Sequence, residues 1–213
     1  MILVGLTGGI GAGKSTVAAA LVRRGAALVD ADRVARQVLE PNGGAYHAVV
    51  RRFGAGIVEG AGHIDRRALA AVAFSDPAAL ADLNALTHPV IRRVMADRIA
   101  EHRSAAGGRP GAVVVDIPLV DRTTVDGWAL DGLVVVDTPD DEALRRLVDQ
   151  RGLSEGDARA RMANQISRAA RRALVAPGPG SVPGHVVDNS GTLGALEAEV
   201  DRAWDWIESI GAR

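Results

Sequence analysis

The chain of 213 residues has no cysteine, few aromatic residues and a single lysine. The absence of cysteine excludes disulfides, thiolate metal sites and thiol catalysis. Aromatic residues make up 3% of the chain and its formal net charge is −1, which argues against a nucleic-acid surface, because such a surface needs a basic face and stacking rings. No apolar run approaches the length of a membrane span. We therefore expect small-molecule chemistry, with no nucleic acid and no membrane as partner.

The hydrophobic content of 47% is enough to bury one substantial core, so we expect a single domain over residues 1–213. No cationic segment precedes the first apolar residues. We therefore expect neither a signal peptide nor a transit peptide, and a cytoplasmic protein. The expected assembly is a monomer, with an oligomer left open.

The single lysine, Lys14, stands against 24 arginines and lies within residues 8–15, which read GGIGAGKS. This run is a complete G-x-x-x-x-G-K-[ST] phosphate loop. A compact ammonium reaches the β and γ phosphates through a narrow turn, where a planar guanidinium is a poor substitute. The lone lysine therefore marks a predicted active site.

The flanks of the loop also fit, because residues 2–6 are typical of a buried parallel strand and residues 14–23 of a helix that ends at Gly25. Glycines let backbone N–H groups turn inward around phosphates, and the helix N-terminus adds the positive end of its dipole. The Ser15 hydroxyl is placed to ligate Mg²⁺, and Thr16 can add a phosphate contact. The pattern predicts nucleotide binding, against the alternative of a plain glycine-rich turn.

Further apolar, β-rich runs alternate with helical patterns, which implies a mostly parallel sheet with helices on both faces. These runs lie at 26–29, 112–115, 133–136 and 185–187. Together with the phosphate loop they predict an α/β fold, a P-loop NTPase three-layer sandwich with a mostly parallel five-stranded sheet.

Three helical regions are expected beside this sheet. Residues 33–103 indicate several helices, broken at 41–44, 54–62 and 76–77, and this insertion is expected to hold the second substrate. A helical pair, at 140–150 and 154–174, is split by Gly152. A final helix after Thr192 carries a stripe that predicts packing on the core, made of Leu193, Leu196, Val200, Trp204 and Ile207.

Carboxylates follow two of the predicted strands, at the sheet edge where ligands of open parallel sheets sit. Asp30 and Asp32 follow the second strand, and we expect Asp32 to orient an acceptor hydroxyl in line with the γ phosphate. The alternative is that Asp32 is a helix N-cap. Asp116 ends the strand at 112–115 and resembles a Walker B carboxylate that holds magnesium, the alternative being an ordinary turn aspartate.

Eight arginines lie between residues 140 and 172. If this segment closes over ATP, one or two guanidinium groups could stabilise charge on the transferring phosphate. The alternative for any single arginine is a solvated position on a helix surface.

Several stretches together resemble the dephospho-CoA kinase family, in order and over almost the whole chain. They are residues 5–15, 29–36, 87–92, 115–119 and 187–189, which include T-G-G-I-G, D-A-D, H-P and D-x-P-L. The resemblance implies an enzyme that phosphorylates the ribose 3′-hydroxyl of dephospho-CoA with ATP, the last step of coenzyme A synthesis. It also implies that the helical region of about 33–105 binds the acceptor and that about 139–174 forms a lid.

The resemblance also implies roles for individual residues. The implied ATP-binding residues are Gly11, Ala12, Gly13, Lys14, Ser15, Thr16 and Asn189. The implied catalytic residues are Asp32, Lys14 and the lid arginine Arg146, with Arg145 and Arg151 left open as its rivals. Acceptor-binding roles fall on Asp30, His88, Asp116, Pro118 and Leu119, and Mg²⁺ binding on Ser15 and Asp116.

Two other functions share parts of this pattern. A shikimate-type kinase has the same loop and a D-x-D, but a compact acceptor needs less enclosure than the long helical insertion provides. A nucleotide-dependent switch needs an attacking water, and it would not need a carboxylate placed for a bulky alcohol.

Overall fold

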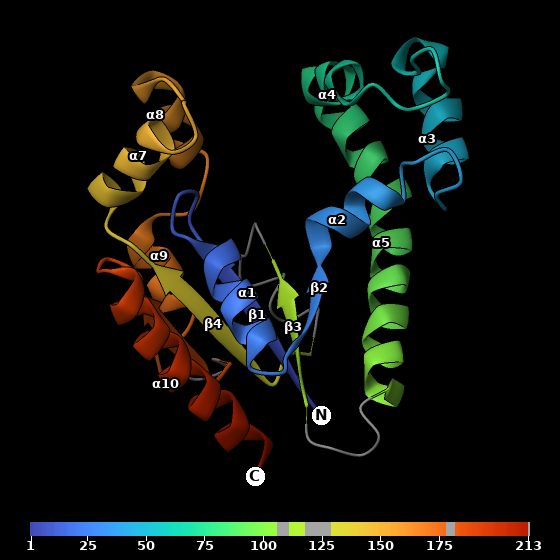
Figure 1. The fold of residues 1–213 in the computed structure, drawn as a ribbon. Coiled ribbons are helices and arrows are strands. Elements are labelled where there is room, and N and C mark those ends of the chain that lie inside the picture. Colours follow the sequence, from blue (N-terminus) through green and yellow to red (C-terminus); the bar gives the residue numbers. More distant parts are fainter. Residues whose placement is uncertain (106–110, 118–128, 178–181, 213) are drawn as a thin grey trace. The chain divides into compact units, whose positions relative to one another are not determined.

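The computed structural model describes residues 1–105, 111–117, 129–177 and 182–212 (Figure 1). Pro118 and Leu119 lie outside the described residues. The chain forms two compact units, one made of Met1–Val29 with His102–Arg213 and the other of Asp30–Glu101. The first unit holds the phosphate loop, and the second covers most of the predicted helical insertion.

The first unit is built on a five-stranded sheet with the order β2-β3-β1-β4-β5. Its strands are β1 (Ile2–Gly8), β2 (Ala27–Asp30), β3 (Ala112–Asp116), β4 (Gly132–Asp137) and β5 (Gly184–Asp188). β1 pairs in parallel with both β3 and β4, and β4 pairs in parallel with β5. Valine-rich runs form these strands because branched side chains pack well on a pleated surface that is covered on both faces. The parallel sheet confirms the predicted α/β class.

One face of this sheet packs against α1 (Lys14–Arg23) and α10 (Leu193–Gly211), which lie together over β1 and β4 (Figure 1). The shared core includes Val4, Leu6, Val17, Leu21, Val114, Val134, Val200 and Ile207. Each such side chain stabilises the fold by about 1.5–3 kcal/mol when it is fully buried. This core fixes the start of α1, and therefore the loop, against the ends of β1 and β4.

The stripe predicted for α10 is correct except at its first residue. Leu196, Val200 and Ile207 are buried, but Leu193 is 75% exposed. Leu193 is the first residue after the N-cap Thr192, one turn before the first buried position of the helix. The core contact of α10 therefore begins at Leu196.

The arginine-rich segment contains α7 (Asp140–Asp149), α8 (Glu155–Ala163) and α9 (Arg168–Ala173). The prediction of one continuous helix over 154–174 is wrong, because residues 164–167 interrupt it. Ser154 caps α8 and Ser167 caps α9, each with a side chain that accepts a backbone N–H at 3.1 Å. The second serine starts a new helix where periodicity alone indicates a continuation.

The second unit is helical. Its elements are α2 (Ala31–Gln37), α3 (Tyr46–Phe53), the short 3₁₀ helix η1 (Ala55–Ile57), α4 (Arg66–Ser75) and α5 (Pro77–Ala105), which runs on into the first unit. The breaks predicted at 41–44, 54–62 and 76–77 are confirmed, with η1 inside the second of them. Within the part of the chain that the structure describes, none of the helices combines the length and apolar character needed to cross a membrane.

Candidate functional site

The loop between β1 and α1 depends on glycine at two positions with positive φ. Gly11 has φ 78° and Gly13 has φ 84°, in the left-handed region that side chains disfavour. A Cβ atom on Gly11 would lie 2.6 Å from the carbonyl oxygen of Ala143, and one on Gly13 would collide with the amide of Asn189. The loop is therefore packed too tightly for any other residue at these two positions.

Two buried polar side chains hold the Ala12 carbonyl. Asn189 donates its Nδ2 to this oxygen at 2.8 Å, and Thr138 donates its hydroxyl at 3.2 Å. Both side chains follow the ends of neighbouring strands, β5 and β4, so the sheet fixes their positions. These two donors direct the Ala12 carbonyl toward the ends of β4 and β5. The family resemblance implied an ATP contact for Asn189 but gave no role to Thr138, although a polar residue directly after a strand is a usable signal.

Lys14 and Asp116 form an ion pair, in which the Lys14 Nζ atom contacts the Asp116 Oδ1 atom. Their side chains are 17% and 15% exposed. The contact follows from the sheet, because Asp116 is in register with Leu6 at the carboxyl end of β3, beside β1. The structure thus brings together the predicted phosphate-binding lysine and the predicted metal carboxylate.

Ser15 and Asp116 are suited to magnesium. Within the described residues, no group of three His, Cys, Asp or Glu side chains could hold a metal ion by itself. Mg²⁺ in kinases is usually bound by one or two carboxylates together with substrate phosphates and waters. One carboxylate and one exposed hydroxyl in the first turn of α1 match that donor set, so these residues fit the ion as a partner of a bound nucleotide.

A cavity lies beside the second half of the loop, from Gly11 to the start of α1. Its volume of about 460 Å³ is within the range of small-ligand pockets. Its lining includes Gly11, Gly13, Ser15, Thr16, Arg145, Arg146, Arg151, Asn189 and Leu193. The exposed first residue of α10 therefore lines this cavity. The predicted ATP-binding residues Gly11, Gly13, Ser15, Thr16 and Asn189 meet here.

Arg146 and its neighbour Arg145 have different surroundings. Arg146 is 15% exposed and donates to the Asn189 carbonyl at 2.8 Å, whereas Arg145 is 58% exposed. Both pair with Glu142, and the hydrogen bonds from Arg145 and then Arg146 lower the pKa of Glu142 to about 2. Of the two arginines, Arg146 is the one that is hydrogen bonded beside the loop.

The remaining predicted residues belong to the second unit or to the undescribed part. Asp30 is the N-cap of α2, with Oδ1 accepting from the Arg33 N–H at 2.9 Å. The alternative that Asp32 is this cap is therefore wrong, and Asp32 lies exposed in the first turn. His88 is exposed on α5. The acceptor roles of Asp30, Asp32 and His88 stay predictions, as do those of Pro118 and Leu119, which the described residues do not include.

Comparison with known proteins places this loop and sheet in a family. The family model for dephospho-CoA kinase matches residues 2–193. The chain belongs to the dephospho-CoA kinase family. The dephospho-CoA kinase of Frankia casuarinae is 42% identical over 204 residues, covering 96% of this chain and 82% of the relative. That of Corynebacterium jeikeium is 42% identical over 205 residues, covering 96% of this chain and 98% of the relative.

Solved structures show the same fold. A crystal structure of a Thermus thermophilus protein matches with a TM-score of 0.76 and 32% identity, over 98% of this chain and 96% of that one. The dephospho-CoA kinase from Campylobacter jejuni matches with a TM-score of 0.59 and 23% identity, over 96% of each chain. The likeness in sequence therefore extends over both units of the chain.

Proposed function

We propose that this chain transfers the γ-phosphoryl group of ATP to the ribose 3′-hydroxyl of dephospho-CoA, which yields coenzyme A and ADP. The observation that carries the proposal is the glycine-rich loop whose lysine is paired with Asp116 at the end of the neighbouring strand. Membership of the dephospho-CoA kinase family supports this acceptor. The reaction is the last step of coenzyme A biosynthesis in that family.

The loop and Lys14 bind the phosphate chain of ATP. Phosphoryl transfer needs little covalent help from the protein, because its transition state is loose and most catalysis is positioning and charge stabilisation. The backbone N–H groups of the loop and the Lys14 ammonium supply that charge. Ser15 and Asp116 would hold Mg²⁺, which neutralises charge on the β and γ phosphates when it is bound.

The acceptor side depends on Asp32. As the bond from the γ phosphorus to the ADP oxygen breaks, a bond to the 3′-oxygen of the acceptor forms, and the hydroxyl proton passes to the Asp32 carboxylate and then to water. An exposed carboxylate can serve, because a loose transition state removes the proton late. Arg146, beside the second half of the loop, is proposed to meet the charge that develops on the phosphates.

One assay separates this function from its two rivals. ADP release from Mg²⁺ and ATP is measured with dephospho-CoA, with shikimate and without any acceptor. The proposal requires rapid ADP release in the assay with dephospho-CoA, and not in the other two assays. Equal release without an acceptor would indicate a hydrolysing switch, and release with shikimate would indicate a different small-molecule kinase.

A further inference from the structure

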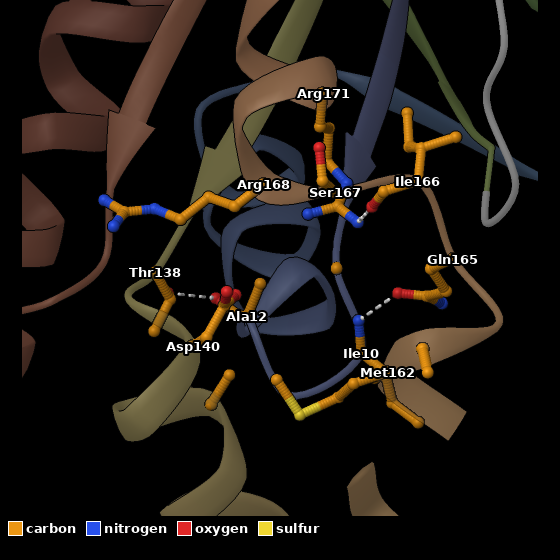
Figure 2. A pocket seen from close by; sticks show the side chains of 13 residues that line it. Ile10, Ala12, Thr138, Asp140, Met162, Gln165, Ile166, Ser167, Arg168 and Arg171 are labelled. Carbon is orange, nitrogen blue, oxygen red and sulfur yellow. Dashed lines mark hydrogen bonds between the residues drawn. The ribbon is translucent and has the colours of Figure 1, made fainter. Parts of the chain in front are cut away.

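The connection between α8 and α9 lies against the first half of the phosphate loop, at Gly9 and Ile10. These two residues do not line the cavity beside Arg146. Figure 2 shows Gln165 and Arg171 both turned toward the loop. The Oε1 atom of Gln165 accepts the Ile10 N–H at 2.9 Å. A Cβ atom on Gly9 would lie 2.8 Å from Nη1 of Arg171, so this guanidinium rests on the glycine backbone. A pocket of about 220 Å³ lies between these residues and α7.

Arg171 differs from the two other arginines of α9. Arg168 and Arg172 both form ion pairs with the Asp137 carboxylate. Within the described part of the chain, Arg171 has no carboxylate at ion-pair distance, and its hydrogen-bond partner is the Ile166 carbonyl at 2.9 Å. Burial lowers the pKa of the Arg171 guanidinium, whereas the negative charges of Asp140 and Asp137 raise it by a smaller amount. The arginine still stays charged at any physiological pH. A half-buried cation without a direct counter-charge is suited to an anionic ligand.

The position of Arg171 is fixed by the sheet. Asp137 is the last residue of β4 and is 3% exposed. Arg168 donates to it through Nε and Nη2, both at 2.8 Å, which is the bidentate geometry that arginine forms with carboxylates. Because Arg168 and Arg172 are four residues apart, they share one face of α9 and hold that face on Asp137. Arg171 then lies on an adjacent face, toward the loop.

We propose that Arg171 binds the terminal phosphate of the nucleotide from the first half of the loop, opposite Arg146. The inference rests on the proposed function, since it needs ATP on this loop. Charge on the transferring phosphoryl group spreads over its oxygens, and a guanidinium already held half-buried against the loop needs little reorganisation to meet that charge. The hydrogen bond of Gln165 holds the connection between α8 and α9 against the loop, and Asp137 holds α9. Arg171 is therefore the phosphate-binding residue, whereas Gln165 and Asp137 are positioning residues.

Nucleotide binding separates this role from a structural one. Calorimetry compares ADP with a non-hydrolysable ATP analogue, each with Mg²⁺, for the wild-type chain and for Arg171→Ala. We expect unchanged affinity for ADP, about tenfold weaker binding of the ATP analogue, and a kcat with dephospho-CoA lower by about 10²-fold, the scale for loss of one charge-stabilising donor. Equal weakening for both nucleotides, or an unchanged kcat, would overturn the proposal.

Two further variants complete the experiment. Arg171→Lys keeps the charge without the planar fork, so we expect it to recover part of the preference for the ATP analogue, and it replaces the alanine variant if that variant does not fold. Arg159→Ala removes an arginine of α8 that is 66% exposed and pairs with Glu155, and we expect wild-type behaviour. If the wild-type chain formed no coenzyme A, the proposed function would fail, but the calorimetry needs no acceptor and would still decide the role of Arg171.

Discussion

At the scale of single residues, neighbouring strands and helix caps set the partners of the predicted site residues. Lys14 pairs with Asp116 across β1 and β3, and Asn189 holds the loop carbonyl of Ala12. Asp30 and Asp32 are two residues apart, yet one caps a helix and the other is exposed. These different surroundings allow binding, catalysis and stability to be separated by single substitutions.

Lys14→Ala should abolish nearly all turnover, because the ammonium serves the phosphates of the ligand. Lys14→Arg should fail as well, since the guanidinium is too broad for the turn. Steady-state rates measure the loss, and circular dichroism checks that the fold is kept. Activity of the arginine variant above about one tenth of wild type would contradict the need for a compact ammonium.

Asp30→Ala should lower the free energy of unfolding by about 1 kcal/mol, the usual effect of losing an N-cap side chain. Asp30→Asn is the matched control, because asparagine caps equally well. Thermal and urea unfolding measure both changes.

Asp32→Asn should leave stability near wild type, because Asp32 is exposed and is not the cap. Its kcat with dephospho-CoA should fall by roughly 10²-fold or more, the scale for losing a positioned base, while ATP affinity measured by calorimetry is kept. Normal turnover by this variant would remove Asp32 from the mechanism.

At the scale of elements, the end of β4 anchors both the loop and the arginine-rich segment. Thr138 holds the Ala12 carbonyl, and Asp137 accepts hydrogen bonds from two arginines of α9. The hydrogen bond from Arg168 keeps the pKa of Asp137 below its ordinary value, although burial acts in the opposite direction. Sequence patterns predicted the strand, the loop and α7 well, because hydrophobic periodicity and the motif are local signals. They could not show that Arg168 and Arg172 share one carboxylate, because that pairing depends on how α9 packs on β4.

Arg146→Ala should lower kcat far more than it raises KM for ATP, since the proposed contact is with charge that develops in the transition state. Arg145→Ala is the matched control on the same helix, and its exposed position predicts activity near wild type. Full steady-state kinetics on both variants provide the measurement. A damaging Arg145→Ala together with a neutral Arg146→Ala would show that Arg145, and not Arg146, meets the transferring phosphate.

The ion pairs of Glu142 in α7 should persist in mild acid. The carboxyl group has an ordinary pKa of 4.5 and a folded pKa of about 2, so its contribution to stability is fully present above pH 4.5 and is lost as the pH falls toward 2. Carbon-detected NMR titration of Glu142 should show the low midpoint, and Arg145→Ala should raise it, because Arg145 is the larger cause. A wild-type midpoint near 4.5 would contradict the pairing.

At the scale of the whole molecule, the chain has one unit with the phosphate loop and another that is mostly helical. Alternating strand and helix patterns were enough to predict the sheet, and the order of motifs was enough to predict the family. The choice between Asp30 and Asp32 as cap was beyond the sequence, because helix starts are uncertain by one or two residues. Arg171 was one of eight similar arginines, and its contact with Gly9 arises from packing that no local pattern encodes.

The identity of the product decides whether the chain phosphorylates the 3′-hydroxyl of dephospho-CoA. Wild-type protein is incubated with Mg²⁺, ATP and dephospho-CoA, ADP is quantified, and the acceptor product is identified by phosphorus NMR. We expect a new 3′-phosphomonoester on the ribose, formed in equal amount to ADP. ADP without that product, or a phosphate at another position of the acceptor, would contradict it.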